Sequence, residues 1–296
     1  MIWEPSQRRR QAVVFIAAVL AVSFAYEGLM IRRGGLGSTG ALGALGLMWL
    51  PAVVSLVLRL AGREGLRDVG WRLGPGRGWL AAYLVPAGCA ASTYGLAWLV
   101  GGVHFAPPPP HAGSHLGPAV RWLVAIAVNG TLGVLIGAVF ALGEELGWRG
   151  YLVPRLVAGK VARPLLVSGV VWGLWHVPLI LWGGYATSAR PWMSALLFLA
   201  VIVPAGVFFG WLRLATGSVW PAVLAHAVHN AWYQNIFAAW FGGRFAPWVA
   251  GEQGAFSILA YSLTALWLWQ SGRLERVSRG FVLAAAQAQK LPTRPA

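Results

Sequence analysis

Apolar stretches of about 20 residues recur along this chain of 296 residues, and they constrain its fold more than any other feature. Only helices and closed barrels can satisfy their backbone hydrogen bonds inside a bilayer. Hydrophobic residues make up 58% of the chain and charged residues 10%, which is outside the range of soluble domains. The sequence therefore predicts an all-α fold, a polytopic transmembrane helical bundle of about eight spans, at residues 11–31, 41–61, 79–101, 122–146, 164–183, 191–212, 218–241 and 254–271.

The basic residues predict the orientation of these spans. If the N-terminus is cytoplasmic, 18 of the 23 Lys and Arg fall on the inner side and 5 on the outer side, as the positive-inside rule requires. Both termini are then cytoplasmic. The net charge of +15 is spread between the spans, so it indicates membrane orientation and no nucleic-acid partner. The high Arg and Ala content with few Lys is typical of a GC-rich bacterial genome, and we expect an integral protein of the bacterial plasma membrane.

Two adjacent glutamates and an arginine occur near the end of the predicted fourth span, in the sequence Gly143-Glu144-Glu145-Leu146-Gly147-Trp148-Arg149-Gly150. A charge at membrane depth costs roughly 3 kcal/mol on insertion scales, so such groups indicate pairing or chemistry. Glu145 and Arg149 are spaced i, i+4 and share a helix face, whereas Glu144 points about 100° away from Glu145. We therefore expect Arg149 to neutralise Glu145 and leave Glu144 free to act. The alternative is a charge cluster at the lipid headgroups.

Histidines within the predicted spans are the second polar feature. His176 precedes Pro178 in the fifth predicted span, and His226, His229 and Asn230 lie in the seventh. His226 and Asn230 are spaced i, i+4 and present hydrogen-bond donors on one face. Three spans can thus contribute polar groups to one buried pocket, although a lone histidine in a helix also serves as an interhelical hydrogen bond.

Residue counting excludes several known protease chemistries. An aspartyl protease needs two aspartates, and Asp68 is the one aspartate in the sequence. The zinc motif H-E-x-x-H does not occur. Ser38, in an outer loop, has no evident histidine partner, and the single Cys89 excludes a disulfide or a cysteine-based metal site within the chain.

Three motifs occur in a fixed order: Glu-Glu-x-x-x-Arg, aromatic-x-x-x-His in the next span, and His-x-x-x-Asn two spans later. This ordered set resembles the CAAX prenyl endopeptidase and bacteriocin-processing family of intramembrane proteases, also called CPBP or Abi and often labelled metalloproteases. The resemblance covers about residues 122–241, which would be the catalytic helices of a single membrane domain spanning 1–296. Residues 272–296 would form a basic cytoplasmic tail, either lying on anionic lipid or disordered.

The resemblance implies roles for individual residues. Glu144 and His176 would activate a water molecule, and His226 and Asn230 would donate hydrogen bonds to the oxyanion. Glu145, Arg149 and Trp172 would support them, Trp172 standing where the family usually has phenylalanine. His229 has no role in the pattern.

The cofactor and the function class stay open at this point. A metal-free glutamate mechanism is favoured, but zinc held by Glu144, His176 and His226 would use the same residues. The expected partners are the lipid bilayer and a membrane-associated peptide or protein substrate. A proton-coupled transporter or a non-catalytic immunity protein would also employ intramembrane Glu and His.

Overall fold

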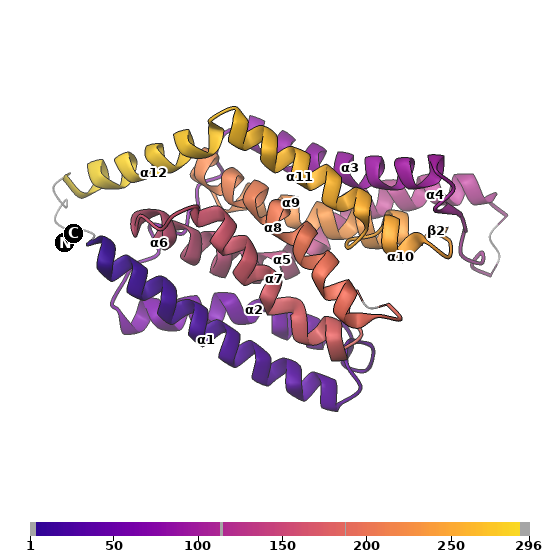
Figure 1. The fold of residues 1–296 in the computed structure, drawn as a ribbon, viewed down its shortest axis with the longest axis horizontal. Helices are drawn as coiled ribbons and strands as arrows, with labels where there is room; N and C mark the ends of the chain where they lie inside the picture. Colours follow the sequence, from indigo (N-terminus) through magenta and orange to yellow (C-terminus); the bar gives the residue numbers. More distant parts are fainter. Residues whose placement is uncertain (1–3, 113–114, 187, 291–296) are drawn as a thin grey trace.

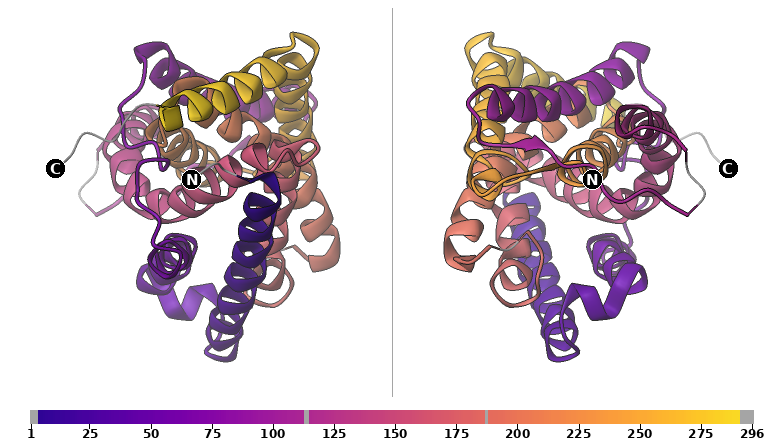
Figure 2. Two further views of the ribbon diagram at one scale, coloured as in Figure 1. Left: turned by 90° about the vertical axis from the view of Figure 1, so that its left-hand side faces the viewer. Right: turned by 90° about the vertical axis from the view of Figure 1, so that its right-hand side faces the viewer.

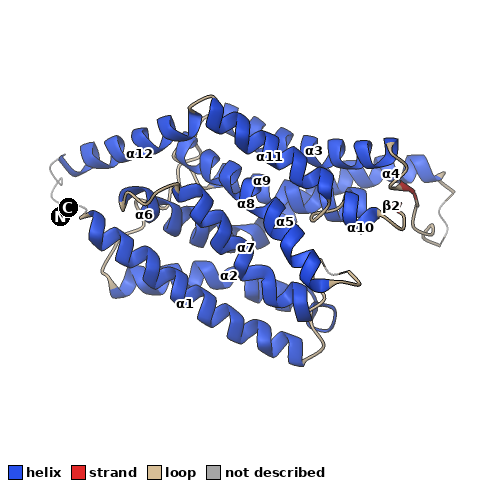
Figure 3. Cartoon of the chain, viewed as in Figure 1, coloured by secondary structure: helices blue, strands red, loops and turns tan. Residues whose placement is uncertain are grey.

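The computed structural model describes residues 4–112, 115–186 and 188–290, and helices form most of them (Figure 3). This confirms the predicted all-α class. The helices are α1 (Pro5–Arg32), α2 (Leu36–Ala61), α3 (Gly76–Leu99), α4 (Pro118–Val128), α5 (Val134–Gly147), α6 (Val153–Ala158), α7 (Pro164–Trp182), α8 (Pro191–Thr216), α9 (Trp220–Asn230), α10 (Ala246–Val249), α11 (Ala255–Gln270) and α12 (Arg273–Lys290), with π-helical segments η1 (Asn129–Gly133), η2 (Trp148–Leu152) and η3 (Ala231–Ala238).

Within the described residues, six helices are long and apolar enough to cross a membrane, so the predicted count of eight is not confirmed. The stretch predicted at 218–241 divides into α9 and the π-helical η3, which contain the polar groups of the third motif. The stretch predicted at 254–271 forms α11, which has 16 residues. The six are Pro5–Arg32, Leu36–Ala61, Gly76–Leu99, Pro118–Ala158, Pro164–Trp182 and Pro191–Thr216.

The fourth of these helices continues past the charged motif instead of ending there. The sequence predicts an end near residue 146, but helical structure runs from Pro118 to Ala158 through α4, η1, α5, η2 and α6. Glu145 and Arg149 form a completely buried ion pair over 2.9 Å. Because the two charges neutralise each other, they do not force the chain out of the apolar interior.

The helices are arranged in layers (Figure 1). Helices α1 and α2 run along one side of the molecule, and α3, α11 and α12 run along the opposite side, with α5 to α9 between them. The end-on views in Figure 2 show the same order. Helix α5 packs against α2 and α9, and α7 packs against α8 and α1. The central layer is therefore covered on both sides, and the three polar motifs lie within it.

Two glycines on α5 set the close approach of α2 to the charged motif. A Cβ at Gly143 would lie 2.6 Å from the carbonyl oxygen of Met48, and a Cβ at Gly147 would overlap Pro51. Small residues spaced four apart let helix backbones approach each other closely in membranes. Glu144 and Glu145 lie between these two contacts and are thus held on the inner face of α5.

The remaining elements are two short strands and the C-terminal helix. Strands β1 (His104–Phe105) and β2 (Phe241–Gly242) pair antiparallel and join the proline-rich loop to the end of η3. The predicted tail forms helix α12, whose Leu274, Val277 and Phe281 pack against α6 and α8. Residues 291–296 of that predicted tail lie outside the described residues.

Candidate active site

A cavity of about 520 Å³ lies between α2, α5, α7 and α9. Glu144, His176, His226 and Asn230 all line it, so three helices bring the four predicted catalytic residues to one space. Much of the remaining wall is apolar, formed by residues such as Leu36, Leu47, Met48 and Phe140. A mostly apolar cavity with a few converging polar groups is the usual form of a binding or active site.

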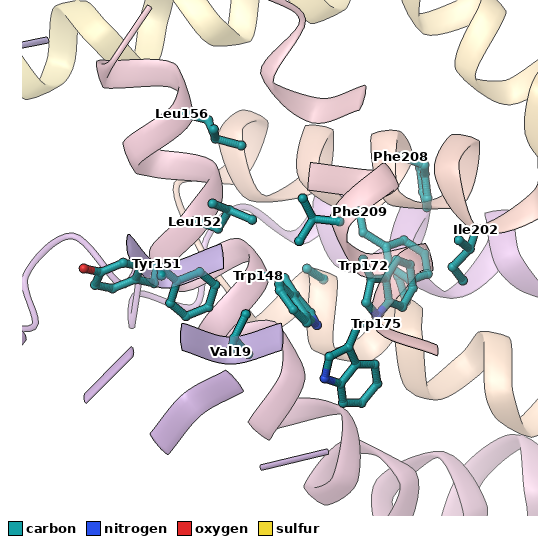
Figure 4. Close-up of a cluster of buried hydrophobic side chains, with 14 of the residues drawn as sticks. Val19, Trp148, Tyr151, Leu152, Leu156, Trp172, Trp175, Ile202, Phe208 and Phe209 are labelled. Carbon is teal, nitrogen blue, oxygen red and sulfur yellow. The ribbon is translucent and has the colours of Figure 1, made fainter. Parts of the chain in front are cut away.

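Glu144 is held by two tryptophans. Its Oε2 accepts hydrogen bonds from the indole Nε1 of Trp172, at 2.7 Å, and of Trp148, at 3.3 Å. Its Oε1 has no hydrogen-bond partner among the described residues. Trp148, Trp172 and Trp175 lie close together in the buried cluster (Figure 4). The carboxylate is thus fixed through one oxygen, and the other remains for a ligand.

His176 presents one defined ring nitrogen to a ligand. Its Nδ1 lies 2.8 Å from the backbone carbonyl oxygen of Trp172. Because a carbonyl oxygen only accepts, Nδ1 carries the proton, and Nε2 of the neutral ring has a free lone pair. The ring stacks with Tyr185 and packs against Phe198 and Trp175. These contacts fix its orientation in the cavity wall.

Glu145 joins two of the predicted residues. Its Oε1 accepts from Arg149 Nη1 at 2.9 Å and lies 2.9 Å from His226 Nδ1. The predicted pairing with Arg149 is present, but sequence spacing does not reveal the contact with His226, which lies 81 residues away. The Arg149 guanidinium also lies over the Trp172 ring, 4.4 Å from its centroid. Glu145 therefore sets the orientation of His226 as well as neutralising Arg149.

Asn230 completes the predicted set. It lines the cavity one turn along α9 from His226, and its amide has no hydrogen-bond partner among the described residues. A primary amide carries two N–H donors. The Asn230 amide is therefore available to a ligand.

A second group of polar residues near the cavity is not indicated by any sequence motif. Glu252 accepts hydrogen bonds from the Tyr185 hydroxyl at 3.0 Å and from Gln234 Nε2 at 2.7 Å. Nε2 of His229 lies 3.6 Å from Glu252 Oε1, and its Nδ1 lies 2.8 Å from the Tyr261 hydroxyl. These residues come from loops and helices far apart in the sequence, and Tyr185, His229 and Gln234 line the cavity. The contact between Trp148 and Glu144, by contrast, can be predicted from the sequence, because the two residues are spaced i, i+4 on a helix.

Burial changes the acidity of the two members of this group that lie in loops. It raises the pKa of Glu252, an effect that hydrogen bonds from Gln234 and Tyr185 partly offset. Burial also raises the pKa of Tyr185 well above its usual range, and the nearby Glu252 carboxylate adds to that shift. The Tyr185 hydroxyl is therefore a proton donor at neutral pH.

The zinc alternative does not fit this arrangement of side chains. In the part of the chain that the structure describes, no three His, Cys, Asp or Glu side chains are grouped so that they could hold a metal ion. Glu144 already uses Oε2 to accept two indole N–H groups. Glu144, His176 and His226 line one cavity without forming a set of metal ligands.

Comparisons with known proteins agree with the ordered motifs. Residues 119–232 match the family described as type II CAAX prenyl endopeptidase Rce1-like, and they include Glu144, His176, His226 and Asn230. CAAX prenyl protease 2 of Methanococcus maripaludis is 31% identical over 102 residues, which are 33% of this chain and 36% of that relative. The matched stretch thus spans about a third of the relative's length. The family resemblance is confirmed over residues 119–232, which are similar to the Rce1-like type II CAAX prenyl endopeptidases.

Proposed function

We propose that the protein is an intramembrane endopeptidase that hydrolyses a peptide bond of a membrane-associated peptide or protein. One observation carries this proposal: Glu144, His176, His226 and Asn230 line one cavity. The match to the endopeptidase family supports the same reaction class. The apolar walls of the cavity suit a substrate that arrives from the bilayer.

In the first step, Glu144 acts as general base. Its Oε1 accepts a proton from a water molecule while Oε2 stays bound to the two indoles. The free Nε2 of His176 accepts a hydrogen bond from the second O–H of that water, which stays on the oxygen, and so orients the water. The water oxygen then forms a bond to the carbonyl carbon of the scissile peptide, and the carbonyl oxygen becomes the oxyanion.

His226 and Asn230 stabilise that oxyanion. Nδ1–H of His226 already donates to Glu145, so Nε2 can donate only when the ring is an imidazolium. Glu145 offsets the charge of that ring, and the Asn230 amide supplies the second donor. An oxyanion donor contributes about 3–4 kcal/mol to transition-state stabilisation. When the C–N bond breaks, the proton held by Glu144 passes to the leaving amine.

The activity is tested with two fluorogenic peptides. One ends in a farnesylated Cys-aliphatic-aliphatic-X sequence, and the other has the same sequence without the farnesyl group. We expect the purified chain in liposomes to cleave at least one of them, and Glu144→Gln to abolish cleavage while keeping the parent's thermal stability. Glu275→Gln, an exposed acid far from the cavity, is the control. Proton or ion flux through the parent that is lost in Glu144→Gln, with neither peptide cleaved, would indicate the transporter alternative instead.

A further inference from the structure

A second cavity, of about 450 Å³, lies between α3, α8 and α12 and has a basic lining. The first turn of α3, the last turns of α8 and the first turns of α12 form its wall. Arg77, Arg273 and Arg276 line it, and none of the acidic residues that the structure describes does. Three guanidinium groups around one space bind an anion with oxygen acceptors, of which phosphate is the best match.

These arginines keep most of their hydrogen-bond donors free. Arg77 makes no hydrogen bond or ion pair with the described residues. Arg276 donates to the carbonyl oxygen of Ser271 over 2.9 Å, and Arg273 lies over the Trp267 ring, 4.5 Å from its centroid. A guanidinium has five N–H donors, so each of the three can still bind a ligand.

Glu64, Asp68 and Glu275 are already paired with other arginines. Arg59 and Arg155 both pair with Asp68, and Arg155 also pairs with Glu64. On α12, Glu275 pairs with Arg279. The positive charge of the cavity is therefore not neutralised by acids of the described chain.

Two further groups favour an anion at this place. Trp211 lines the cavity, and its indole N–H is buried without an acceptor in the described residues. Helix α3 begins at Gly76 and is 24 residues long, so its positive end lies at the cavity, where the N–H of Gly78 donates to the Pro75 carbonyl oxygen and those of Gly76 and Arg77 have no acceptor among the described residues. Within the described residues, the Trp211 indole and the N–H groups of Gly76 and Arg77 are therefore available to an anion.

The location of the cavity indicates which phosphate it receives. It lies where two apolar helices, α3 and α8, reach the end of their span, on the side that the Lys and Arg distribution predicts to be cytoplasmic. Leu212, Ala215 and Val277 give the same cavity an apolar part. We propose that this cavity binds the phosphate group of an anionic membrane lipid, with the arginines at the headgroup and the apolar part against the acyl chains. This site is independent of the proposed peptidase activity.

Native mass spectrometry of the full chain in detergent tests the proposal. The probes are a short-chain phosphatidylglycerol, the phosphatidylcholine of equal chain length, and inorganic phosphate. We expect one phosphatidylglycerol to bind in preference to phosphatidylcholine, and each of Arg77→Gln, Arg273→Gln and Arg276→Gln to weaken it about fivefold. Arg279→Gln is the matched control on α12, because Arg279 does not line the cavity.

Several outcomes would overturn the proposal. Equal binding of the two lipids would show that the arginines do not select an anionic headgroup. Equal weakening by Arg279→Gln would indicate a general charge effect. Inorganic phosphate that displaces the lipid at equal concentration would identify a free anion as the ligand. Thermal unfolding of each variant detects a folding defect. Arg77→Lys keeps the positive charge and should retain most of the binding.

Discussion

The indole N–H of Trp172 donates a hydrogen bond to Oε2 of Glu144 over 2.7 Å, which ties α7 to α5 inside the cavity wall. The same tryptophan supplies the carbonyl oxygen that holds Nδ1 of His176. One residue thus orients both groups that we propose to activate water. Phenylalanine, the usual residue of the resembling family at this place, would keep the aromatic packing and the carbonyl but would not donate to Glu144.

We therefore expect Trp172→Phe to lower peptidase activity without unfolding the protein. A hydrogen bond to a charged group contributes about 1.5–3 kcal/mol, so kcat/KM should fall by about 10- to 100-fold. Trp175→Phe is the matched control, because Trp175 is equally buried and its indole N–H has no partner in the described residues. Trp172→Phe should lose much more activity than Trp175→Phe, and equal losses of activity would contradict the role given to the Trp172 indole.

Glu145→Gln should reduce both stability and activity. The change leaves Arg149 as a buried cation without its ion pair, which costs about 3–5 kcal/mol of unfolding free energy. It also removes the carboxylate that accepts from His226, so the imidazolium form that donates to the oxyanion is less favoured. Chemical unfolding and turnover at saturating substrate measure the two effects, and kcat should fall more than KM rises.

The Glu145 assignment has an internal control. In Glu145→Gln with Arg149→Met, the unpaired cation is also removed, so stability should recover part of the loss while activity stays low. Coupling between contacting residues of this kind is typically 0.5–3 kcal/mol. Recovery of activity together with stability would mean that Glu145 acts on folding alone.

The sequence predicts the features of this protein that depend on local spacing. The apolar stretches reveal the helical membrane fold, and the i, i+4 rule reveals the pair Glu145 and Arg149. The ordered motifs identify the four residues that share the cavity. The first two follow from composition or from positions within one helix, and the four cavity residues follow from the resemblance to a known family.

Features that depend on contacts between helices could not be read in this way. The distance from Glu145 to His226 depends on how α5 and α9 pack, and the Glu252 group joins two loops to η3. The continuation of the fourth helix to Ala158 was missed because charged residues ordinarily end an apolar segment, whereas here they neutralise each other. The count of spans differs for other reasons. Polar residues within α9 and η3 lower the apolar character that a span requires, and α11 has 16 residues.

Glu252 should make stability depend on pH. Burial raises its pKa above the ordinary value of 4.5, so the folded state binds this proton more tightly than the unfolded state. The stabilisation from protonated Glu252 is complete below pH 4.5 and is lost as pH rises through the raised pKa. As the pH rises from 4.5 through the raised pKa of Glu252, the Tm of the parent should therefore fall relative to that of Glu252→Gln. Glu275→Gln should give a curve parallel to the parent's, and a parent that gains stability relative to Glu252→Gln on raising the pH would contradict the assignment.

Chelation tests whether the reaction uses a metal ion. We expect peptidase activity to survive exhaustive chelation, with no stoichiometric zinc in the purified protein by elemental analysis. The reason is that the described residues contain no group of three side chains that could hold a metal ion, and that the free amide of Asn230 suits an oxyanion that needs N–H donors. A zinc ion would instead require the Nε2 lone pair of His226.

His226→Asn, which keeps an N–H donor, should accordingly retain more activity than His226→Ala. One equivalent of zinc that leaves together with the activity, and restores it on readdition, would assign Glu144, His176 and His226 to a metal site.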